Sequence, residues 1–592
     1  MNKLNCHQAL PGCTVKTASG FALLLAACLA PLAQAQVLPA DVKPTCTTST
    51  PPSAGAPPAP AFAQWFNPAG VQVDGLVKPA DSVNFPDASA CSFYQWSEQM
   101  FLWLVSPTPK NLSGGDRIFL SSAFYGVSPE VSVGGKPPAR TFIPQDQKHA
   151  MKFSPMLTQL GPHNLPIGFD TSGKLVEVLP PPAGNKRLLQ LQTQLKNGSL
   201  GENVVQSIKA NVKGGFKYQD AAGNDVDVTI GQAGGNVLMA QNGSLVYYSI
   251  VTNDLYAYFF TQNAAADPAK LQYPTTAEEL AKVADYAKKV GFKPLAAPEA
   301  LAMEIKMSWI ETTGFDDATK KKFITIKAEV PKVDTNNIKS VNLQNGATRK
   351  VELALVGMHV VGSAKGNPEL IWATFEHDHN TPNAEYSYFD VNGATKTVPQ
   401  DTKGKWLFSQ DGATGPFDQR LYDTSSTTIT CLDKSNPCVV KPNNTLRWKA
   451  WGAASNQNPR QADPTHPGPV ITPPESNTDI ISINQSVISQ LADGDVRKNY
   501  RMIGSTWTTG GRTPDKASAG AINQVGTSML ANTTMETVFQ GVSTDWLGDV
   551  SGNPKYPSLN CFACHSTNTV NTSHIWPKLT PLPTAQLKAK SK

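Results

Sequence analysis

The stretch TRKVELALVGMHVVGSAKGNPELIWATFEHDHN, residues 348–380, determines the class of fold. Apolar side chains alternate with polar or small ones on both sides of SAKGNP, a turn that contains Gly and Pro. This alternation is typical of half-buried strands, and such a turn can reverse the chain. We therefore expect an antiparallel pair of strands. Residues 302–312, AMEIKMSWIET, have the same pattern and predict another strand.

Helices are expected around this sheet. Residues 90–107, ACSFYQWSEQMFLWLVSP, repeat large apolar side chains at helical spacing until Pro107 and predict a buried aromatic helix. Residues 275–292 predict a surface helix with a capping box at its start and Gly291 at its end. Residues 478–507 have helical character, with Asp495 expected on an exposed face. The fold class is thus α+β: a large antiparallel-β-rich body, residues 63–525, with peripheral helices.

The N-terminus has the features of an export signal. Residues 1–35 combine positive charge, an apolar run over 21–32 and the A-x-A pattern of 33–35. The apolar run is shorter than the roughly 20 residues that span a bilayer, so no transmembrane segment is expected. An alternative reading makes Cys28, in LAAC, a lipid anchor. We expect a periplasmic protein in which residues 36–62 form a Pro-rich linker.

Charge and cysteine content narrow the possibilities further. A net charge of +5 on 592 residues argues against nucleic-acid binding. Export favours disulfides, and four cysteines outside the signal and the C-terminal motif can form two of them. Cys431 and Cys438 can close a small loop, and Cys46 would then pair with Cys91, although four cysteines allow three pairings.

The C-terminal segment, residues 526–592, carries the chemistry. Cys561, Cys564 and His565 form C-x-x-C-H, the attachment sequence of c-type haem. Two thiols on one helical turn can bond to the two vinyl groups, and the next residue then places its imidazole on the iron. A zinc site would need a second C-x-x-C or His pair. We expect one covalent haem c in a cytochrome c-like segment that is too short to enclose it, so the body should supply one wall.

The second axial ligand has several candidates, because no Met follows His565. Met529 and Met535 lie on a predicted amphipathic helix over residues 526–541 and are the leading candidates. His574 is the only downstream histidine. His359 and His377 are candidates from the body, and a strand hairpin could bring both rings to one surface.

No second metal site is expected from the cluster of histidines in FEHDHN. His377 and His379 should share one strand face, with Asp378 on the opposite face, which leaves only two ligands together. The cofactor is therefore haem alone.

The chain resembles large bacterial exported cytochrome c family proteins with a single C-terminal C-x-x-C-H motif. The similarity rests on stretches such as SFYQWSEQMFLWLVSP, VGMHVVGSAKGNPELIWATFEHDHNTP and CFACH. The resemblance implies haem binding and electron transfer, and a body that belongs with its haem segment. It also implies a shared role for His359, Glu376 and His377.

Two functions agree with these features. The first is electron transfer with a redox partner protein by a six-coordinate haem. The alternative is a haem-dependent oxidoreductase, peroxidase- or oxygenase-like, whose open iron site is shaped by the large body.

Overall fold

The computed structural model covers most of the predicted body. It describes residues 38–52, 54–57, 59–128, 139–145, 167–170, 175–179, 186–199, 204–209, 216–226, 228–230, 237–337, 340–342, 347–410, 428–430, 439–447, 449–452, 473–511, 524–527, 530–536, 561–565, 569–573, 575–576 and 579–584. The predictions for the signal segment, Cys28, Met529, His574 and the Cys431–Cys438 loop lie outside these residues, and so does the side chain of Cys564.

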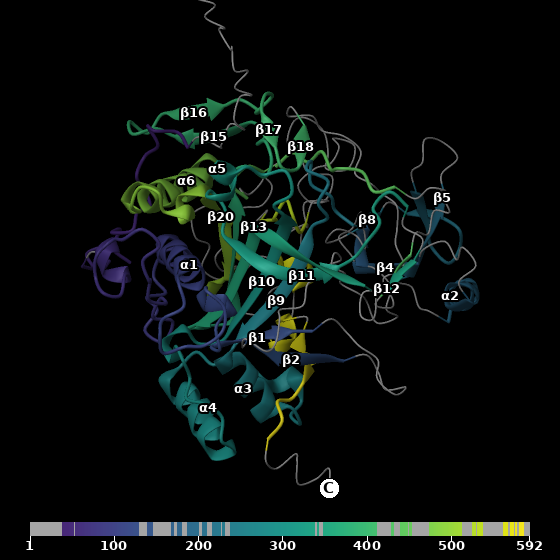
Figure 1. Cartoon of the computed structure of the whole chain (residues 1–592), viewed down its shortest axis with the longest axis horizontal. Coiled ribbons are helices and arrows are strands. Elements are labelled where there is room, and N and C mark those ends of the chain that lie inside the picture. Colours follow the sequence, from purple (N-terminus) through teal and green to yellow (C-terminus); the bar gives the residue numbers. More distant parts are fainter. Residues whose placement is uncertain are drawn as a thin grey trace, which may run out of the picture. The chain divides into compact units, whose positions relative to one another are not determined.

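A ten-stranded sheet forms the centre of the fold (Figure 1). Its strands follow the order β21-β20-β14-β13-β10-β9-β1-β2-β22, and β11 also pairs with β13. The bounds are β1 (Phe124–Val127), β2 (Arg140–Pro144), β9 (Tyr247–Asn253), β10 (Met303–Glu311), β11 (Thr325–Pro331), β13 (Thr348–Ala364), β14 (Asn367–His377), β20 (Tyr500–Thr508), β21 (Gln524–Gly526) and β22 (Leu579–Thr580). The pairing of β2 with β22 is parallel, and the long central pairs are antiparallel. The predicted α+β class with a large antiparallel sheet is confirmed.

Smaller sheets and several helices complete the described chain. The second sheet contains β3 (Ile167–Asp170), β4 (Leu175–Leu179), β5 (Val204–Lys209), β6 (Phe216–Gln219), β7 (Asp225–Val226) and β8 (Val228–Ile230). Three strand pairs are β12 (Ser340–Asn342) with β19 (Thr428–Thr430), β15 (Tyr386–Phe389) with β16 (Thr395–Val398), and β17 (Lys405–Trp406) with β18 (Ser409–Gln410). The helices are α1 (Ala90–Leu104), α2 (Lys186–Lys196), α3 (Asp254–Asn263), α4 (Ala277–Val290), α5 (Asp317–Lys320), α6 (Pro473–Gln490) and α8 (Cys561–Cys564). Within the described residues, none of these helices has the length and apolarity that crossing a bilayer requires.

The register of the central strands decides which side chains share a face. The predicted hairpin forms between β13 and β14, where His359 lies opposite Thr374 and Val361 lies opposite Trp372. On the other side of β13, Lys306 of β10 lies opposite His359. Because side chains alternate along a strand, these residues point to one side of the sheet. We call this side the polar face and define it by Glu304, Lys306, Ser308, His359, Trp372, Thr374 and Glu376.

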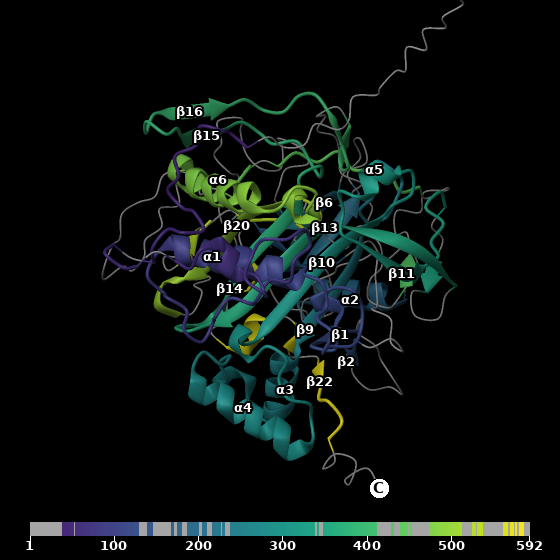
Figure 2. The same ribbon diagram turned by 60° about the vertical axis from the view of Figure 1, so that its left-hand side comes forward.

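Helices α1 and α6 cover the opposite face (Figure 2). Phe101 of α1 stacks on Phe375 of β14 with ring centroids 4.2 Å apart, and Phe93 stacks on Trp507 of β20 at 3.8 Å. Asn484 of α6 donates its side-chain N–H to the Met502 carbonyl at 2.8 Å. The predicted aromatic helix is confirmed, and each stacked pair adds about 0.5–1.5 kcal/mol beyond its buried area.

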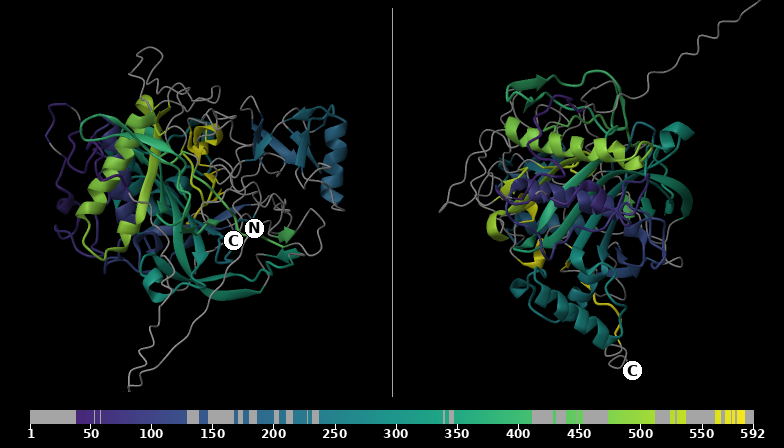
Figure 3. Two further views of the ribbon diagram at one scale, coloured as in Figure 1. Left: turned by 90° about the horizontal axis from the view of Figure 1, so that it is seen from above. Right: turned by 90° about the vertical axis from the view of Figure 1, so that its left-hand side faces the viewer.

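The predicted surface helix is also confirmed as α4, which pairs with α3 at one end of the sheet, while α6 crosses the other end (Figure 3). Thr276 accepts the Glu279 backbone N–H, and the Glu279 carboxylate accepts the Thr276 N–H. Gly291 ends the helix with φ of 80°. These reciprocal bonds satisfy the first-turn donors that a helix leaves without partners.

The prediction for residues 478–507 is correct only in its first half. Helix α6 ends at Gln490, and residues 500–508 form the buried strand β20. Asp495, expected to be exposed, is buried because Arg497 pairs with it at 2.6 Å and Asp74 donates a backbone N–H to it at 3.0 Å. The apolar run that ends at Trp507 therefore extends as a core strand instead of continuing the helix.

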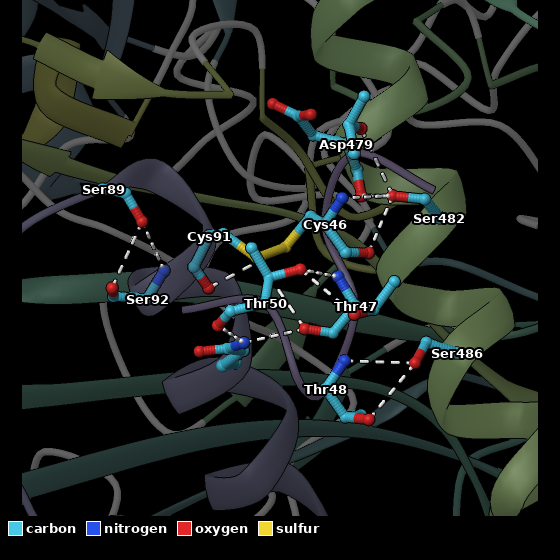
Figure 4. Close-up of a disulfide and its surroundings, with 12 residues drawn as sticks. Cys46, Thr47, Thr48, Thr50, Ser89, Cys91, Ser92, Asp479, Ser482 and Ser486 are labelled. Atoms are coloured by element: carbon cyan, nitrogen blue, oxygen red, sulfur yellow. Dashed lines mark hydrogen bonds between the residues drawn. A yellow bond between two sulfur atoms is a disulfide. The ribbon is translucent and has the colours of Figure 1, made fainter. Parts of the chain in front are cut away.

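The segment before α1 is held to that helix by a disulfide and by the Gln95 side chain, which donates to the Thr47 and Thr50 carbonyls, and it is also bonded to α6 (Figure 4). A disulfide joins Cys46 to Cys91 at the start of α1, with the two Cα atoms 5.4 Å apart. The backbone N–H groups of Cys46 and Thr48 donate to the hydroxyls of Ser482 and Ser486, at 3.0 and 3.1 Å. This pairing is the one that the cysteine spacing favoured.

Replacing both Cys46 and Cys91 with Ser should lower the free energy of unfolding by roughly 2–4 kcal/mol, because the crosslink closes a long loop in the unfolded chain. The two residues are 45 positions apart in the sequence. Denaturant titrations of the oxidised parent and of the variant would measure the loss. Each single variant should lose as much unfolding free energy as the double variant, because either change removes the disulfide. If all three variants unfold at the same denaturant concentration as the parent, the crosslink is contradicted.

Candidate functional site

The C-x-x-C-H motif folds into a short helix followed directly by its histidine. Helix α8 spans Cys561–Cys564, and the backbone N–H of His565 donates to the Cys561 carbonyl at 2.9 Å. The helical turn therefore continues up to His565. This is the local geometry that the haem interpretation requires, in which the two cysteines occupy one turn and the imidazole follows it.

The imidazole of His565 is held in a defined orientation and tautomer. Its Nδ1 lies 2.8 Å from the carbonyl oxygen of Thr572, at the end of a 3-10 helix over Val570–Thr572. A carbonyl can only accept, so Nδ1 carries the proton and the lone pair of the ring is on Nε2. The ring also packs on Trp372 of the polar face, with centroids 4.3 Å apart. Histidines that bind metals commonly donate their second N–H to a carbonyl in this way.

An aromatic wall surrounds the motif. Phe562, within α8, is buried and meets Trp372 edge to face. Both belong to an apolar cluster that also contains Trp576 and residues of α3, such as Phe260, whose ring centroid lies 4.7 Å from that of Trp576. The body thus covers one side of the motif with aromatic side chains.

Polar contacts extend this connection to β10 and α3. The Ser573 hydroxyl bonds to the carboxylate of Glu304 on the polar face and lies 2.8 Å from the Tyr256 hydroxyl. Tyr273 donates its hydroxyl to the Val570 carbonyl at 3.1 Å. The turn that orients His565 is therefore fixed by partners more than 200 residues earlier in the chain.

A second C-terminal stretch, residues 530–536, lies on the polar face beside the motif. Cys561 Sγ is 3.9 Å from the Leu530 carbonyl oxygen. The backbone N–H of Thr533 donates to Glu376 Oε1 at 2.8 Å, and Arg447 pairs with Glu376 Oε2 at 2.5 Å. The side chains of Glu376 and Arg447 are both fully buried, so this carboxylate anchors the stretch from within the protein.

Gly357 allows this close approach. A Cβ at this position of β13 would lie 2.5 Å from Thr534 Oγ1 and 2.6 Å from Ser308 Oγ. The Thr534 and Ser308 hydroxyls bond to each other at 2.6 Å across this gap. A side chain at position 357 would therefore push the C-terminal stretch away from the sheet.

The helix predicted over residues 526–541 is wrong for the residues that the structure describes. Gln524–Gly526 is a strand, and residues 530–536 run as an irregular segment with a turn. The Asn532 side chain accepts the Thr534 N–H at 3.0 Å and donates to Thr374 at 2.9 Å. Such Asn and Thr contacts compete with helical hydrogen bonds and favour turns.

Met535, a leading ligand candidate, lies inside an apolar cluster. Its side chain is fully buried together with Tyr248, Ile310, Ala354 and other apolar residues. Ile310 of β10 lies opposite Ala354 of β13. On β10, Ile310 is six residues from Glu304, which lies in the same cross-strand row as Trp372. At about 3.4 Å per residue, this separation is roughly 20 Å along the strands.

His359 lies much nearer to the motif. On β13, His359 is two residues, or roughly 7 Å, from Val361, which lies opposite Trp372. Its Nε2 is 3.0 Å from Glu536 Oε1, and Lys306 Nζ is 3.6 Å from the same oxygen. The side chains of His359, Lys306 and Glu536 are 17, 15 and 11% exposed. We call these three residues the His359 triad. Their side chains remain partly accessible to solvent on the polar face.

The triad is electrostatically complementary. Burial by itself raises the pKa of Glu536, but the charges and hydrogen bonds of His359, Lys306 and the Asn532 N–H outweigh it and lower the pKa to about 2. Sequence reasoning identified His359 but missed Lys306 and Glu536. The 177 residues that separate His359 from Glu536 left no pattern to connect them.

His377 does not join His359 on one surface, and that expectation is wrong. His359 lies opposite Thr374 and Gly357 opposite Glu376, so His377 has the opposite parity on β14. Its ring stacks on Phe323 with centroids 3.7 Å apart. Glu376 and His377 therefore serve different sides of the sheet.

Comparison with known proteins gives no relative: no family model, curated protein or solved structure matches this chain.

Replacing Glu536 with Gln should reduce stability at neutral pH, by an amount that disappears in acid. A carboxyl with a folded pKa of about 2 stabilises the protein above its unfolded pKa of 4.5, and this contribution is lost as pH falls from 4.5 towards 2. The expected difference between parent and variant at pH 7 is on the order of 3 kcal/mol. Urea titrations between pH 7 and pH 2.5 would measure it.

The exposed Glu385 provides the matched control. Glu385→Gln should leave stability within about 0.5 kcal/mol of the parent at each pH. A Glu536→Gln difference that stays constant across this pH range would contradict the ionic role of the Glu536 carboxylate.

Proposed function

We propose that this chain is an exported monohaem c-type cytochrome that transfers single electrons between partner proteins. Haem would be attached through Cys561 and Cys564, with His565 as the proximal iron ligand. The observation that carries the proposal is the bond from His565 Nδ1 to the Thr572 carbonyl, directly after the α8 turn. A proton on Nδ1 places the lone pair of the ring on Nε2, the nitrogen that would bind the iron. In the part of the chain that the structure describes, no group of ligands that could complete a zinc site includes His565.

The surroundings of the motif fit a porphyrin. A large apolar ring favours burial against apolar groups, and Trp372, Phe562 and Trp576 form one aromatic cluster next to the motif. When bound, haem supplies a one-electron couple whose potential depends on its ligands and their hydrogen bonds. The Thr572 carbonyl would orient the His565 ring and make it more basic, while Trp372 would exclude water from one side of it.

The register supports His359 over Met535 as the second axial ligand. Met535 fills an apolar cluster roughly 20 Å along the sheet from Trp372, whereas His359 is one step away. Because Nε2 of His359 donates its hydrogen to Glu536, Nδ1 is the nitrogen of that ring that could bind the iron. A covalently attached haem with two axial protein ligands would suit an electron carrier.

The same triad supports the second candidate, a haem-dependent oxidoreductase with an open distal site. His359 beside the charged Glu536 is a histidine–carboxylate pair, the arrangement that acts as a general base in enzymes. Its partial exposure would allow a small substrate to reach it. The two functions differ in the coordination number of the iron.

The first test is covalent attachment. Protein exported from a host that matures c-type cytochromes should be red, with one haem per chain by the pyridine haemochrome assay. Haem staining on denaturing gels should be lost in Cys561→Ser/Cys564→Ser, because no thioether can form. Cys46→Ser/Cys91→Ser is the matched control and should keep its haem. A colourless parent would contradict the proposal.

The second test is the distal ligand. The parent should be six-coordinate and slow to bind carbon monoxide or cyanide, and His359→Ala should bind both at least ~10-fold faster because the competing ligand is gone. Met535→Leu is the matched control and should leave the absorption spectrum unchanged. A Met535→Leu spectrum that changes while that of His359→Ala does not would overturn the assignment. Rapid binding by the parent would favour the open-site enzyme.

A further inference from the structure

The residues His377, Asp378 and His379 converge, contrary to the expectation that Asp378 points away. Strand β14 ends at His377, and the Asn380 N–H donates to the His377 carbonyl at 3.1 Å, which closes a turn. Strand alternation no longer applies in a turn. Asp378 Oδ1 therefore lies 3.4 Å from His377 Nδ1 and accepts a hydrogen bond from His379 Nδ1 at 2.5 Å. One potential ligand atom from each residue lies within 4.8 Å of the others.

The His377 ring presents its lone pair to this cluster. Its Nε2 is 3.0 Å from the Lys322 carbonyl oxygen, which can only accept, so the proton is on Nε2 and the lone pair is on Nδ1. That lone pair faces the carboxylate oxygen of Asp378, and neither atom has a hydrogen to share with the other. The His379 backbone N–H lies 3.2 Å from His377 Nδ1, and the His379 ring donates its Nδ1–H to Asp378 Oδ1. A metal ion bound here would take the place of that ring proton, which would move to His379 Nε2.

The surroundings support the same arrangement. Arg501 donates to Asp378 Oδ2 at 3.2 Å, which leaves Oδ1 directed to the histidines. A carbonyl on the remote nitrogen of a histidine and a hydrogen bond to the remote oxygen of a carboxylate are typical outer partners of metal ligands.

Backbone hydrogen bonds hold the turn in place from both sides. The Asp378 N–H donates to the Asn499 carbonyl, and the His379 carbonyl accepts from Leu407, both at 2.9 Å. The three side chains are thus held close together before any ion binds, which lowers the ordering cost of binding. Only the 2.5 Å contact between Asp378 Oδ1 and His379 Nδ1 has to open for both atoms to reach one ion.

We infer that His377 Nδ1, Asp378 Oδ1 and His379 Nδ1 bind a divalent transition-metal ion, for which Zn²⁺ is the best match. Two imidazoles and one carboxylate are ligands of Zn²⁺, whereas Mg²⁺ and Ca²⁺ prefer oxygen ligands alone. Three protein ligands leave a fourth position for water. The side chain of His379 is 11% exposed and offers the way in. This site is independent of the proposed haem.

Zinc content tests the inference without interference from haem iron. Full-length exported protein without a polyhistidine tag would be treated with a chelator, dialysed against micromolar ZnCl₂ and then buffer, and measured by mass spectrometry for zinc per chain. The parent should retain about one equivalent. His379→Ala and Asp378→Asn should each weaken zinc binding on the order of 100-fold, since each removes a ligand from a three-ligand site.

A matched control and a folding readout separate binding from structure. His359→Gln removes a histidine outside the cluster and should keep its zinc. Zinc should raise the melting temperature of the parent and of His359→Gln, but not that of the two cluster variants. If His379→Ala fails to fold, Asp378→Asn alone decides. The inference is overturned if the parent retains no zinc, or if the folded cluster variants retain as much as the parent.

Discussion

A buried carboxylate, Glu376, holds the C-terminal part of the chain on the central sheet. Its side chain and that of Arg447 are fully buried and meet at 2.5 Å, and Thr533 donates its N–H to the same carboxylate. Removing one partner of such a pair costs about 3–5 kcal/mol, because the other charge remains without compensation. Residues 530–536 also bring Glu536 to His359, so this pair helps to complete the polar face.

The sheet determines which groups can act together, through the parity of its strands. His359 and Trp372 share a face, so one C-terminal segment can reach both. His377 follows Glu376 directly and points the other way, towards Phe323. Glu376 and His377, although adjacent in the sequence, thus lie on opposite sides of the sheet. The side chain of His377 therefore cannot act together with those of His359 and Glu376 through direct contact.

Local patterns made much of the fold predictable, and long-range contacts set the limit. The β13–β14 hairpin, the aromatic helix α1 and the capped helix α4 follow from periodicity and turn residues within each segment. Asp495 was misjudged because its burial depends on Arg497 and on a backbone group at Asp74, 421 residues earlier. The C-terminal stretch was misjudged because Asn532 bonds to strand β14 rather than within a helix.

The candidate site shows the same division. C-x-x-C-H can be recognised because its three residues lie close together in the sequence, whereas the partners that orient His565 and His359 are brought to them only by folding. The turn after β14 shows a different limit. Its residues are adjacent in the sequence, and yet the prediction that Asp378 points away from His377 and His379 was wrong. Alternation holds only while strand pairing lasts, and the Asn380–His377 bond ends it one residue before Asp378. The end of a strand is therefore a place where consecutive side chains can converge, as those of His377, Asp378 and His379 do.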